Sequence, residues 1–352
     1  MLDVVSTLQD LVRIPSVNPM GQEACGDEYF EWRLTDYLEA LFRQLQLPFI
    51  RQAVAPRREN IIARLEAPNP PPQDGPLVLW EVHQDTVPAE GMRISPWQAE
   101  VREGRLYGRG ACDVKGGMAC MLAALARLAD ERPAQRPTIV LACSVNEECG
   151  FTGARRLPQL WSGAGSSFLP RRPDAAIVVE PTGFDVVVAH KGVLRWKCHT
   201  TGRAAHSATP ELGDNAIYKM SRVLQGFERY AAQILPGLGK DVRLGQATLS
   251  VGTISGGLSA NTVPDRCTVD IDRRLLPEEQ PEAAYDQAVR FIAEWCPPDA
   301  TPEHEAPYLC APALADAQNG HLAEQVQTLV RRTGISARQI GVAYATDASA
   351  LA

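Results

Sequence analysis

Apolar residues in the first half of the chain follow two different patterns, and each predicts one kind of element. At three- and four-residue spacing they predict helices, which we expect at residues 2–12, 28–46 and 116–129. Short runs that are apolar throughout are typical of strands buried on both faces of a sheet. Three such runs are present: Leu77–Trp80, Thr138–Ala142 and Ala175–Val179. The alternation of strand and helix predicts an α/β domain with a mostly parallel central sheet.

The pattern changes at about residue 192. Residues 193–200 alternate apolar and polar positions, as a strand with one solvated face does. The elements predicted after it are a helix at 215–232, strands at 247–254 and 266–275, and a helix at 282–295. We therefore expect a small α+β domain at residues 191–306, inserted into a first domain made of residues 1–190 and 307–352.

Proline-rich stretches predict the loops. One at residues 67–76 holds five prolines, and another at 297–307 marks the end of the insertion. A helix predicted at 321–332 then returns the chain to the first domain.

Composition narrows the class of protein. The chain has 352 residues, of which 45% are hydrophobic and 22% charged, as in an ordinary soluble globular protein. Its net charge of -7 argues against a nucleic-acid or anionic-membrane binder. No apolar run is long enough to span a membrane, and residues 1–10 lack the features of a signal peptide. Nine cysteines without a C-x-x-C pair favour a reducing, cytoplasmic location.

Polar residues follow each of the three buried strands. His83 and Asp85 follow the first, Glu147 and Glu148 the second, and Glu180 the third. Ligands bind at the carboxyl ends of the strands in open α/β sheets, so these side chains are expected at one edge. Asp113, in the glycine-rich turn before the next helix, joins them. Clustered carboxylates need a compensating charge, and a mixture of imidazole and carboxylate suits zinc.

Each of these residues also has a plainer interpretation. A single histidine before a loop is commonly a hydrogen-bonded structural residue, and a Glu-Glu pair is commonly solvated. The run Gly108-x-Gly110-x-x-Asp113 approaches a dinucleotide-binding fingerprint, but it lacks the third glycine and follows no buried strand. What favours a metal site is that polar residues stand at every strand end.

Four ordered motifs resemble a known family, the M20 zinc aminoacylases and carboxypeptidases, which includes acetylornithine deacetylase, succinyl-diaminopimelate desuccinylase and glutamate carboxypeptidase. The motifs are Val82-His83-Gln84-Asp85-Thr86-Val87-Pro88, Gly108-Arg109-Gly110-Ala111-Cys112-Asp113-Val114-Lys115-Gly116-Gly117, Asn146-Glu147-Glu148-Cys149-Gly150 and Val179-Glu180-Pro181. The resemblance covers essentially the whole chain. It implies a two-domain metallohydrolase whose inserted α+β domain is a lid that also forms a homodimer.

The resemblance also implies roles for the strand-end residues. His83 and Glu180 would bind one zinc ion, Glu148 would bind a second, and Asp113 would bridge both. Asp85 would accept a hydrogen bond from the far nitrogen of His83. Glu147 would be the general base toward a water activated between the two ions, where Co²⁺ may substitute for Zn²⁺.

The inserted domain carries further matches. His206, in Gly202-Arg203-Ala204-Ala205-His206-Ser207, resembles the family histidine that reaches into the partner subunit's site and stabilises the oxyanion. Gly257, Asn261 and Arg274 resemble the clamp for the substrate carboxylate. Arg274 is favoured over Arg273 by its spacing from Asn261.

One departure from the family pattern concerns the second metal ion. The family takes its remaining ligand from a histidine near the C-terminus, whereas the last histidine here is His321. Thr346 or Asp347 resembles a helix N-cap, but only five residues follow Asp347. The expectation is that the chain is cut within an element of its first domain, or that another group replaces the lost ligand.

The function we expect is hydrolysis of the amide bond of an N-acyl-L-amino acid, in the manner of acetylornithine deacetylase. The alternatives are a dipeptidase or carboxypeptidase of the same family, a catalytically inactive truncated dimer, and a nucleotide-binding α/β protein. The expected partners are a small N-acyl amino acid or short peptide and a second copy of the chain, but no nucleic acid and no membrane.

Overall fold

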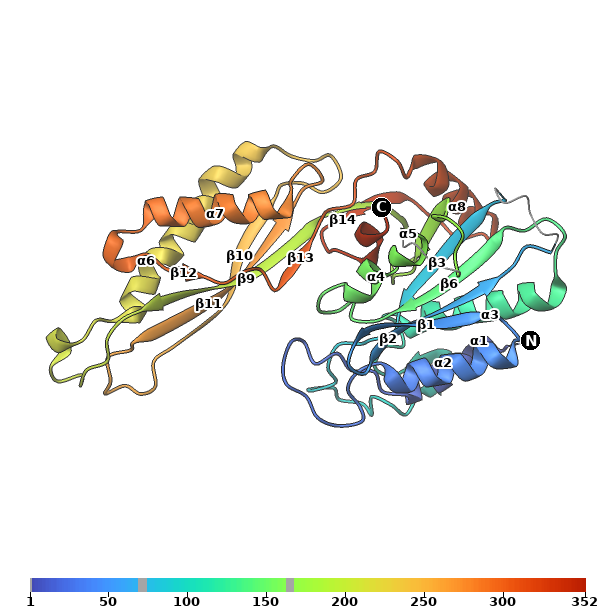
Figure 1. The fold of residues 1–352 in the computed structure, drawn as a ribbon, viewed down its shortest axis with the longest axis horizontal. Coiled ribbons are helices and arrows are strands. Elements are labelled where there is room, and N and C mark those ends of the chain that lie inside the picture. Colours follow the sequence, from blue (N-terminus) through green and yellow to red (C-terminus); the bar gives the residue numbers. More distant parts are fainter. Residues whose placement is uncertain (1, 69–74, 163–167) are drawn as a thin grey trace. The chain divides into compact units, whose positions relative to one another are not determined.

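The computed structural model describes residues 2–68, 75–162 and 168–352. Most of the proline-rich stretch at 67–76 therefore lies outside the described residues. The chain divides into two compact units (Figure 1). Unit 1 is residues 1–184 with 346–352, and unit 2 is residues 185–345.

Unit 1 is built on a five-stranded mixed sheet in the order β1-β2-β6-β3-β7. Its strands are β1 (Phe49–Ala55), β2 (Arg58–Leu65), β3 (Leu77–His83), β6 (Thr138–Ser144) and β7 (Ala175–Val178). β3 runs parallel to both of its neighbours, β6 and β7. β1 and β2 form an antiparallel hairpin, and β2 is also antiparallel to β6. The sheet is thus evenly mixed rather than mostly parallel, because a tight hairpin forms one side of it.

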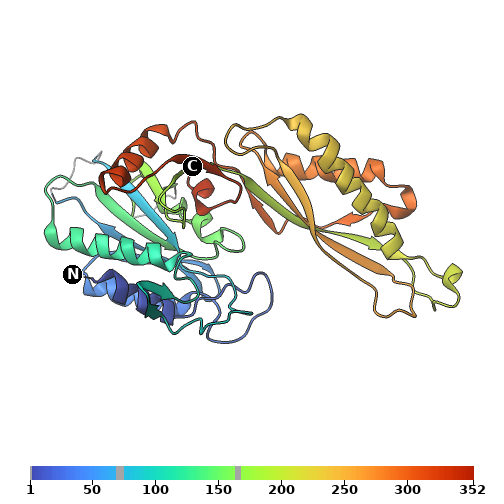
Figure 2. The same ribbon diagram turned by 180° about the vertical axis from the view of Figure 1, so that it is seen from behind.

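Helices cover both faces of this sheet. Ile139, Leu141 and Cys143 of β6 pack with α1 (Val4–Arg13), α2 (Trp32–Gln44) and α3 (Lys115–Glu131). The alternate residues Val140 and Ala142 pack on the other face with α5 (Gln159–Ser162) and with Leu157, which follows α4 (Thr152–Arg156). Figure 2 shows α1 to α3 together on their side of the sheet. A strand buried on both faces must be apolar at every position, which explains its continuous apolar run.

Unit 2 is built on an antiparallel sheet in the order β10-β11-β9-β12, with β13 also paired to β9. The strands are β9 (Gly192–Thr201), β10 (Thr248–Gly256), β11 (Arg266–Leu275), β12 (Glu303–His304) and β13 (Leu309–Ala311). Helices α6 (Ala216–Arg229) and α7 (Pro281–Trp295) bury their apolar sides against one face, around Trp196 and Phe227. The other face is more exposed, and this produces the alternation read from the sequence.

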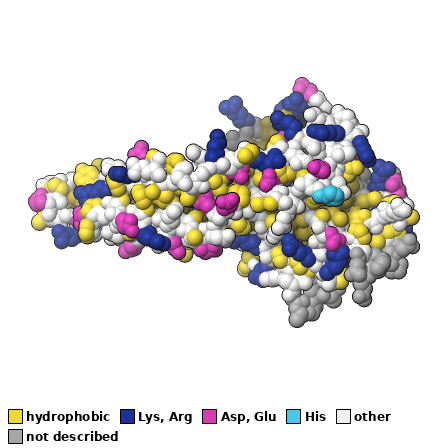
Figure 3. Space-filling model, turned by 90° about the horizontal axis from the view of Figure 1, so that it is seen from above, with side chains coloured by type: hydrophobic (Ala, Val, Ile, Leu, Met, Phe, Trp, Pro, Cys, Tyr) yellow, Lys and Arg dark blue, Asp and Glu magenta, His cyan; other side chains and the backbone are white. Residues whose placement is uncertain are grey.

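The remaining elements are short or peripheral. β8 (Val186–His190) pairs in parallel with β14 (Gln339–Val342), and α8 (Gly320–Arg332) contacts β8. The others are β4 (Glu100–Arg102), β5 (Arg105–Tyr107), η1 (Pro210–Leu212), η2 (Tyr230–Ile234), η3 (Leu235–Leu238), η4 (Pro298–Ala300) and η5 (Asp347–Ala350). Figure 3 shows one face of the molecule, on which basic and acidic side chains are intermixed with hydrophobic ones. Among the described helices, none has both the length and the apolar character that a membrane crossing requires.

The α/β fold class predicted from the sequence is confirmed. The boundary between the two units differs from the expected one, however. Residues 307–345 were expected in the first domain, but they lie in unit 2. The physical reason is the pairing of β14 with β8, which holds this segment beside the start of unit 2. The hairpin β1–β2 and the pair β8–β14 were not predicted. The expected cap at Thr346 is present, since its side chain accepts a hydrogen bond from the N–H of Ala348 in η5.

Candidate metal centre

Three adjacent strands of unit 1 end at the same edge of the sheet. His83 is the last residue of β3, and its register partner Ser144 is the last residue of the parallel neighbour β6. Glu147 and Glu148 follow β6 directly, and Glu180 follows β7. Because β3, β6 and β7 run parallel, their carboxyl ends bring these side chains to one place, as the strand-end pattern predicted.

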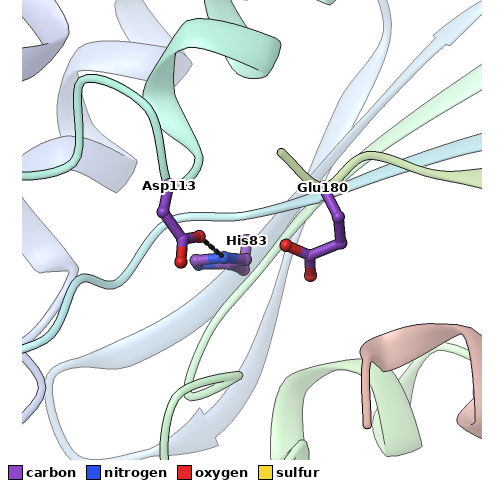
Figure 4. Close-up of side chains that lie close together, drawn as sticks. All are labelled: His83, Asp113 and Glu180. Carbon is purple, nitrogen blue, oxygen red and sulfur yellow. Dashed lines mark hydrogen bonds and ion pairs between the residues drawn. The ribbon is translucent and has the colours of Figure 1, made fainter. Parts of the chain in front are cut away.

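His83, Asp113 and Glu180 lie close enough together to share an ion (Figure 4). One ligand atom from each lies within 4.8 Å of those from the other two. Nε2 of His83 is 3.2 Å from Oδ1 of Asp113, which comes from the loop before α3. The imidazole is only 2% exposed, whereas Asp113 is exposed and Glu180 half-buried. One nitrogen and two carboxylate donors can therefore converge on a cation at the edge of the sheet.

Glu148 is held beside this group by a different contact. Its Oε1 accepts a hydrogen bond of 3.1 Å from the N–H of Val87, in the loop that follows Asp85. The three-residue group above does not include it. Glu147 is half-buried; its charge raises the pKa of His83, and the charge of Glu180 in turn raises the pKa of Glu147.

Asp85 makes a different contact from the one expected. Nδ1 of His83 lies 2.9 Å from the main-chain carbonyl oxygen of Asp85, but 3.7 Å from its carboxylate. Because a carbonyl oxygen only accepts hydrogen bonds, Nδ1 carries a proton, and Nε2 is the nitrogen that can give up its proton to bind a metal. The carboxylate of Asp85 instead accepts the N–H groups of Glu147 and Glu148, at 3.0 and 3.1 Å. It orients the loop rather than the imidazole.

Burial raises the pKa of the carboxyl groups in this cluster. The pKa of Glu148 rises to about 7 and that of Glu180 to about 8, while that of Glu147 lies well above its ordinary value. Burial alone would lower the pKa of His83, but the hydrogen bond to Asp113 and the surrounding carboxylates raise it well above its ordinary value. A divalent cation would offset the cost of burying these charges, so the residues present fit a metal ion.

A second pair of buried carboxyl groups, Glu81 and Asp347, lies close enough to His83 to interact with its charge. Oγ of Ser144 lies within hydrogen-bond distance of Glu81 of β3 and, at 3.0 Å, of Asp347, and its single proton goes to one of these two carboxyl groups. Burial raises the pKa of Asp347 to about 6, and burial together with Asp347 raises that of Glu81 well above its ordinary value. Neither residue was predicted as part of this cluster, and Asp347 was expected only as a possible helix N-cap. The available signal was Glu81 itself, a charged residue inside a run of apolar strand positions.

A buried lysine, also missed by sequence reasoning, ties α1 to the loop that carries Asp113. Nζ of Lys115 is fully buried and donates to the carbonyl oxygens of Leu11 and Ile14, at 3.0 and 2.7 Å. Burial lowers the pKa of this amine to about 7. The lysine therefore donates to carbonyl groups at the C-terminal end of α1, where the regular pattern of helical hydrogen bonds ends.

The residues predicted on the inserted domain form two groups in unit 2. His206 is exposed, and its neighbour Ser207 donates to the carbonyl oxygen of Asn261 at 3.0 Å. Gly257 follows β10, whose last residue pairs with Cys267 at the start of β11.

Arg274 lies at the opposite end of β11, seven residues from Cys267, or about 23 Å at the rise of a strand. Within one chain, the structure does not bring Arg274 together with Gly257 and Asn261. The guanidinium of Arg274 pairs with Asp272 at 2.6 Å. Its neighbour Arg273 is fully buried and pairs with Glu279.

Comparisons with known proteins agree on one family. The model of peptidase family M20/M25/M40 matches residues 79–352. A probable succinyl-diaminopimelate desuccinylase of Staphylococcus aureus (strain MSSA476) is 28% identical over 298 residues, covering 78% of this chain and 68% of the relative. The acetylornithine deacetylase of Vibrio cholerae serotype O1 (strain M66-2) is 32% identical over 283 residues, with the same coverage. That of Myxococcus xanthus is 35% identical over 201 residues, covering 57% of this chain and 50% of the relative.

Solved structures show the same fold. A metallo-carboxypeptidase from Sulfolobus solfataricus matches with a TM-score of 0.77 at 16% identity, covering 99% of this chain and 88% of that one. A tripeptidase from Staphylococcus aureus matches with a TM-score of 0.72 at 20% identity, covering 99% of this chain and 86% of that one. At these identities the structural likeness concerns the fold alone.

Proposed function

Because the chain belongs to peptidase family M20/M25/M40, whose metal-dependent members hydrolyse amide bonds, we propose that it hydrolyses N-acyl-L-amino acids at a site holding two zinc ions. The observation that carries this proposal is the convergence of His83, Asp113 and Glu180 beside Glu147 and Glu148. The relatives named acetylornithine deacetylase support an acylated amino acid as substrate. The resemblance to peptidase structures keeps a dipeptide as the second candidate.

The metal ions would be held by the strand-end residues. His83, Asp113 and Glu180 would bind one ion, and Asp113 with Glu148 the other. Imidazole and carboxylate donors suit zinc, and Nε2 of His83 would bind it after losing the proton that it shares with Asp113. When bound, zinc supplies polarisation of the amide carbonyl and of the attacking water.

Glu147 would move the proton. It precedes a metal ligand without being one, and Asp85 holds its main-chain N–H at 3.0 Å. As the water oxygen attacks the carbonyl carbon, the Glu147 carboxylate takes the water's proton. The C–N bond then breaks, and Glu147 gives the proton to the leaving nitrogen, so that a carboxylate and a free amine are released. Burial supports this role because it raises the pKa of Glu147 well above its ordinary value.

Replacing Glu147 tests the proposal. We expect Glu147→Gln to keep two zinc ions per chain by elemental analysis and to lose about 100-fold or more in kcat on N-acetyl-L-ornithine. Glu131→Gln, at the exposed end of α3, is the matched control and should keep full activity. An unchanged rate for Glu147→Gln would remove it as the base. Hydrolysis of dipeptides but not of N-acyl amino acids would favour the peptidase alternative, and absence of bound metal would contradict the proposal.

We also propose a homodimer through unit 2, in which His206 and Asn261 serve the partner's site. The support is β10, the edge strand of its sheet among the described residues. None of its nine residues is charged, and Ile254 is 56% exposed. Natural edge strands are commonly protected by charges or prolines, so an unprotected edge favours pairing with another strand. A second copy of β10 would supply that strand.

The dimer is tested by Ile254→Lys. We expect this charge to weaken dimerisation by at least about tenfold in Kd, measured by sedimentation, because it places a desolvated lysine at the strand edge. Val242→Lys is the control, since Val242 is 97% exposed in a loop. A monomeric wild-type chain, or an Ile254→Lys dimer of unchanged affinity, would contradict this arrangement.

A further inference from the structure

Asn18 lies in the loop between α1 and α2 and is fully buried. Every hydrogen-bonding position of its amide group is filled. Nδ2 donates to Oδ2 of Asp85 at 2.7 Å and to Oδ1 of Asn146 at 2.9 Å. Oδ1 accepts from the N–H of Met20 at 2.9 Å and from Arg58 at 3.3 Å. Such saturation is the most that an asparagine side chain can reach.

The orientation of this amide is fixed by its neighbours. The N–H of Met20 and the guanidinium of Arg58 can only donate, so the oxygen of Asn18 faces them and its NH₂ group faces Asp85. Arg58 is itself held by a buried ion pair with Glu31, at 3.1 Å. Oε1 of Glu31 also accepts the N–H of Asn146, at 3.2 Å. Asn18, Arg58, Glu31 and Asn146 therefore form a closed ring of hydrogen bonds.

Asn18 connects this ring to the carboxylate of Asp85, which orients the loop that carries Glu147 and Glu148. Oδ1 of Asp85 accepts the N–H of Glu147, and Oδ2 accepts both the N–H of Glu148 and the Nδ2–H of Asn18. Asn146 adopts a left-handed backbone conformation, with φ of 62°, directly before Glu147. An asparagine tolerates this conformation better than most residues, and the contact with Asn18 holds its side chain.

We propose that Asn18 is a positioning residue that, through Asp85 and Asn146, sets the loop carrying Glu147 and Glu148. This inference rests on the proposed function, in which Glu147 is the base and Glu148 a metal ligand. Asn18 touches neither the metal ligands nor the reacting atoms. Its effect on the reaction passes through the hydrogen bonds of Asp85.

The sharpest variant is Asn18→Asp, which keeps the shape of the side chain. It replaces both donors by an oxygen that faces the carboxylate of Asp85. The matched control is Asn319→Asp in unit 2, which also removes two N–H donors, to the carbonyl oxygens of Val188 and Ala315. Asn18→Ser retains one hydroxyl donor and provides a milder change if the aspartate variant does not fold.

Hydrogen exchange in the metal-free chain gives a readout that needs neither metal nor substrate. We expect the amide protons of Glu147 and Glu148 to exchange at least about tenfold faster in Asn18→Asp, because the loop loses its anchor. Zinc affinity should fall about 10- to 100-fold, and kcat should fall by a similar factor while KM changes little. The changes in exchange, zinc affinity and kcat should be smaller in Asn18→Ser and absent in Asn319→Asp.

The results separate this inference from the proposed function. Unchanged exchange at Glu147 and Glu148 in both Asn18 variants would overturn the positioning role, whatever happens to kcat. Equal changes in Asn319→Asp would overturn it as well, because the effect would then be general. If the wild-type chain hydrolyses no amide, the proposed function fails, while exchange and zinc affinity still decide the role of Asn18.

Discussion

Two adjacent arginines show how position decides the role of one residue type. Successive side chains of a strand point to opposite faces, so Arg273 is buried in unit 2 while Arg274 stays half-exposed. Arg273 pairs with Glu279 and also donates to the carbonyl oxygen of Arg274. Its spacing from Asn261 favoured Arg274 for substrate binding. Burial adds a physical reason, because a buried guanidinium paired with Glu279 cannot reach a substrate.

Substitution should separate these two roles. Arg273→Met leaves Glu279 with an uncompensated charge, and we expect a loss of about 3–5 kcal/mol in the free energy of unfolding. Arg274→Met should cost less than about 1 kcal/mol, because its pair with Asp272 is partly solvated. Urea unfolding measures both values. In the proposed function, Arg274→Met also raises KM for N-acyl amino acids, and an unchanged KM would remove Arg274 from the carboxylate clamp.

At the scale of elements, a glycine sets how closely α4 approaches the end of β6. A Cβ built on Gly153 would lie 2.5 Å from the main-chain nitrogen of Val145 and 2.6 Å from Oδ1 of Asn60. Main-chain atoms of a central strand cannot move aside cheaply, so only glycine fits. Val145 lies two residues before Glu147, so this packing also supports the loop that carries Glu147 and Glu148.

Two glycine substitutions should change stability in opposite directions. Gly153→Ala is expected to lower the free energy of unfolding by about 2 kcal/mol or more, because the methyl group overlaps the main chain of Val145. Gly320→Ala, at the first residue of α8 with open space around it, is expected to raise that energy by up to about 1 kcal/mol. Thermal or urea unfolding checks both, and a neutral Gly153→Ala would show that α4 can shift without cost.

At the scale of the whole molecule, the buried acidic cluster links stability to pH and to metal. In the metal-free chain, the pKa of Glu180 is raised to about 8 and that of Glu148 to about 7. The folded chain then holds protons that the unfolded chain has released above about pH 4.5. The folded state is favoured at low pH, and this stability is lost as the pH rises through the folded pKa values. His83, whose pKa is also raised, acts in the same direction.

The metal-free chain should therefore become less stable between pH 5.5 and 7. We expect its free energy of unfolding, measured in urea with a chelator, to fall by at least about 2 kcal/mol over this range. Glu180→Gln should make the fall smaller. Added zinc should stabilise the chain more at pH 7 than at pH 5.5, because protons compete for the ligands. A metal-free chain that gained stability over this range would contradict the raised pKa values.

Much of the fold could be predicted because local pattern determines it. The runs that became β3, β6 and β7 are apolar at every position, and the amphipathic stretches that became α1, α6 and α8 keep their helical spacing. The hairpin β1–β2 was missed because its strands mix charged and apolar residues without regular alternation, as in Phe49–Ala55. Its place beside β6 comes from a long-range pairing that no local signal carries.

The sequence by itself determined which residues stand at the strand ends, since chain order and the direction of parallel strands are enough to bring His83, Glu147 and Glu180 to one edge of the sheet. Only the tertiary structure decided how they are held. Asn18 bonds to Asp85 and Asn146 across 67 and 128 positions of the chain. The tertiary structure likewise placed Arg274 at the end of β11 that is far from Gly257 and Asn261. The reason is physical: periodicity reports the burial of one segment, whereas a hydrogen bond depends on the packed positions of two distant ones.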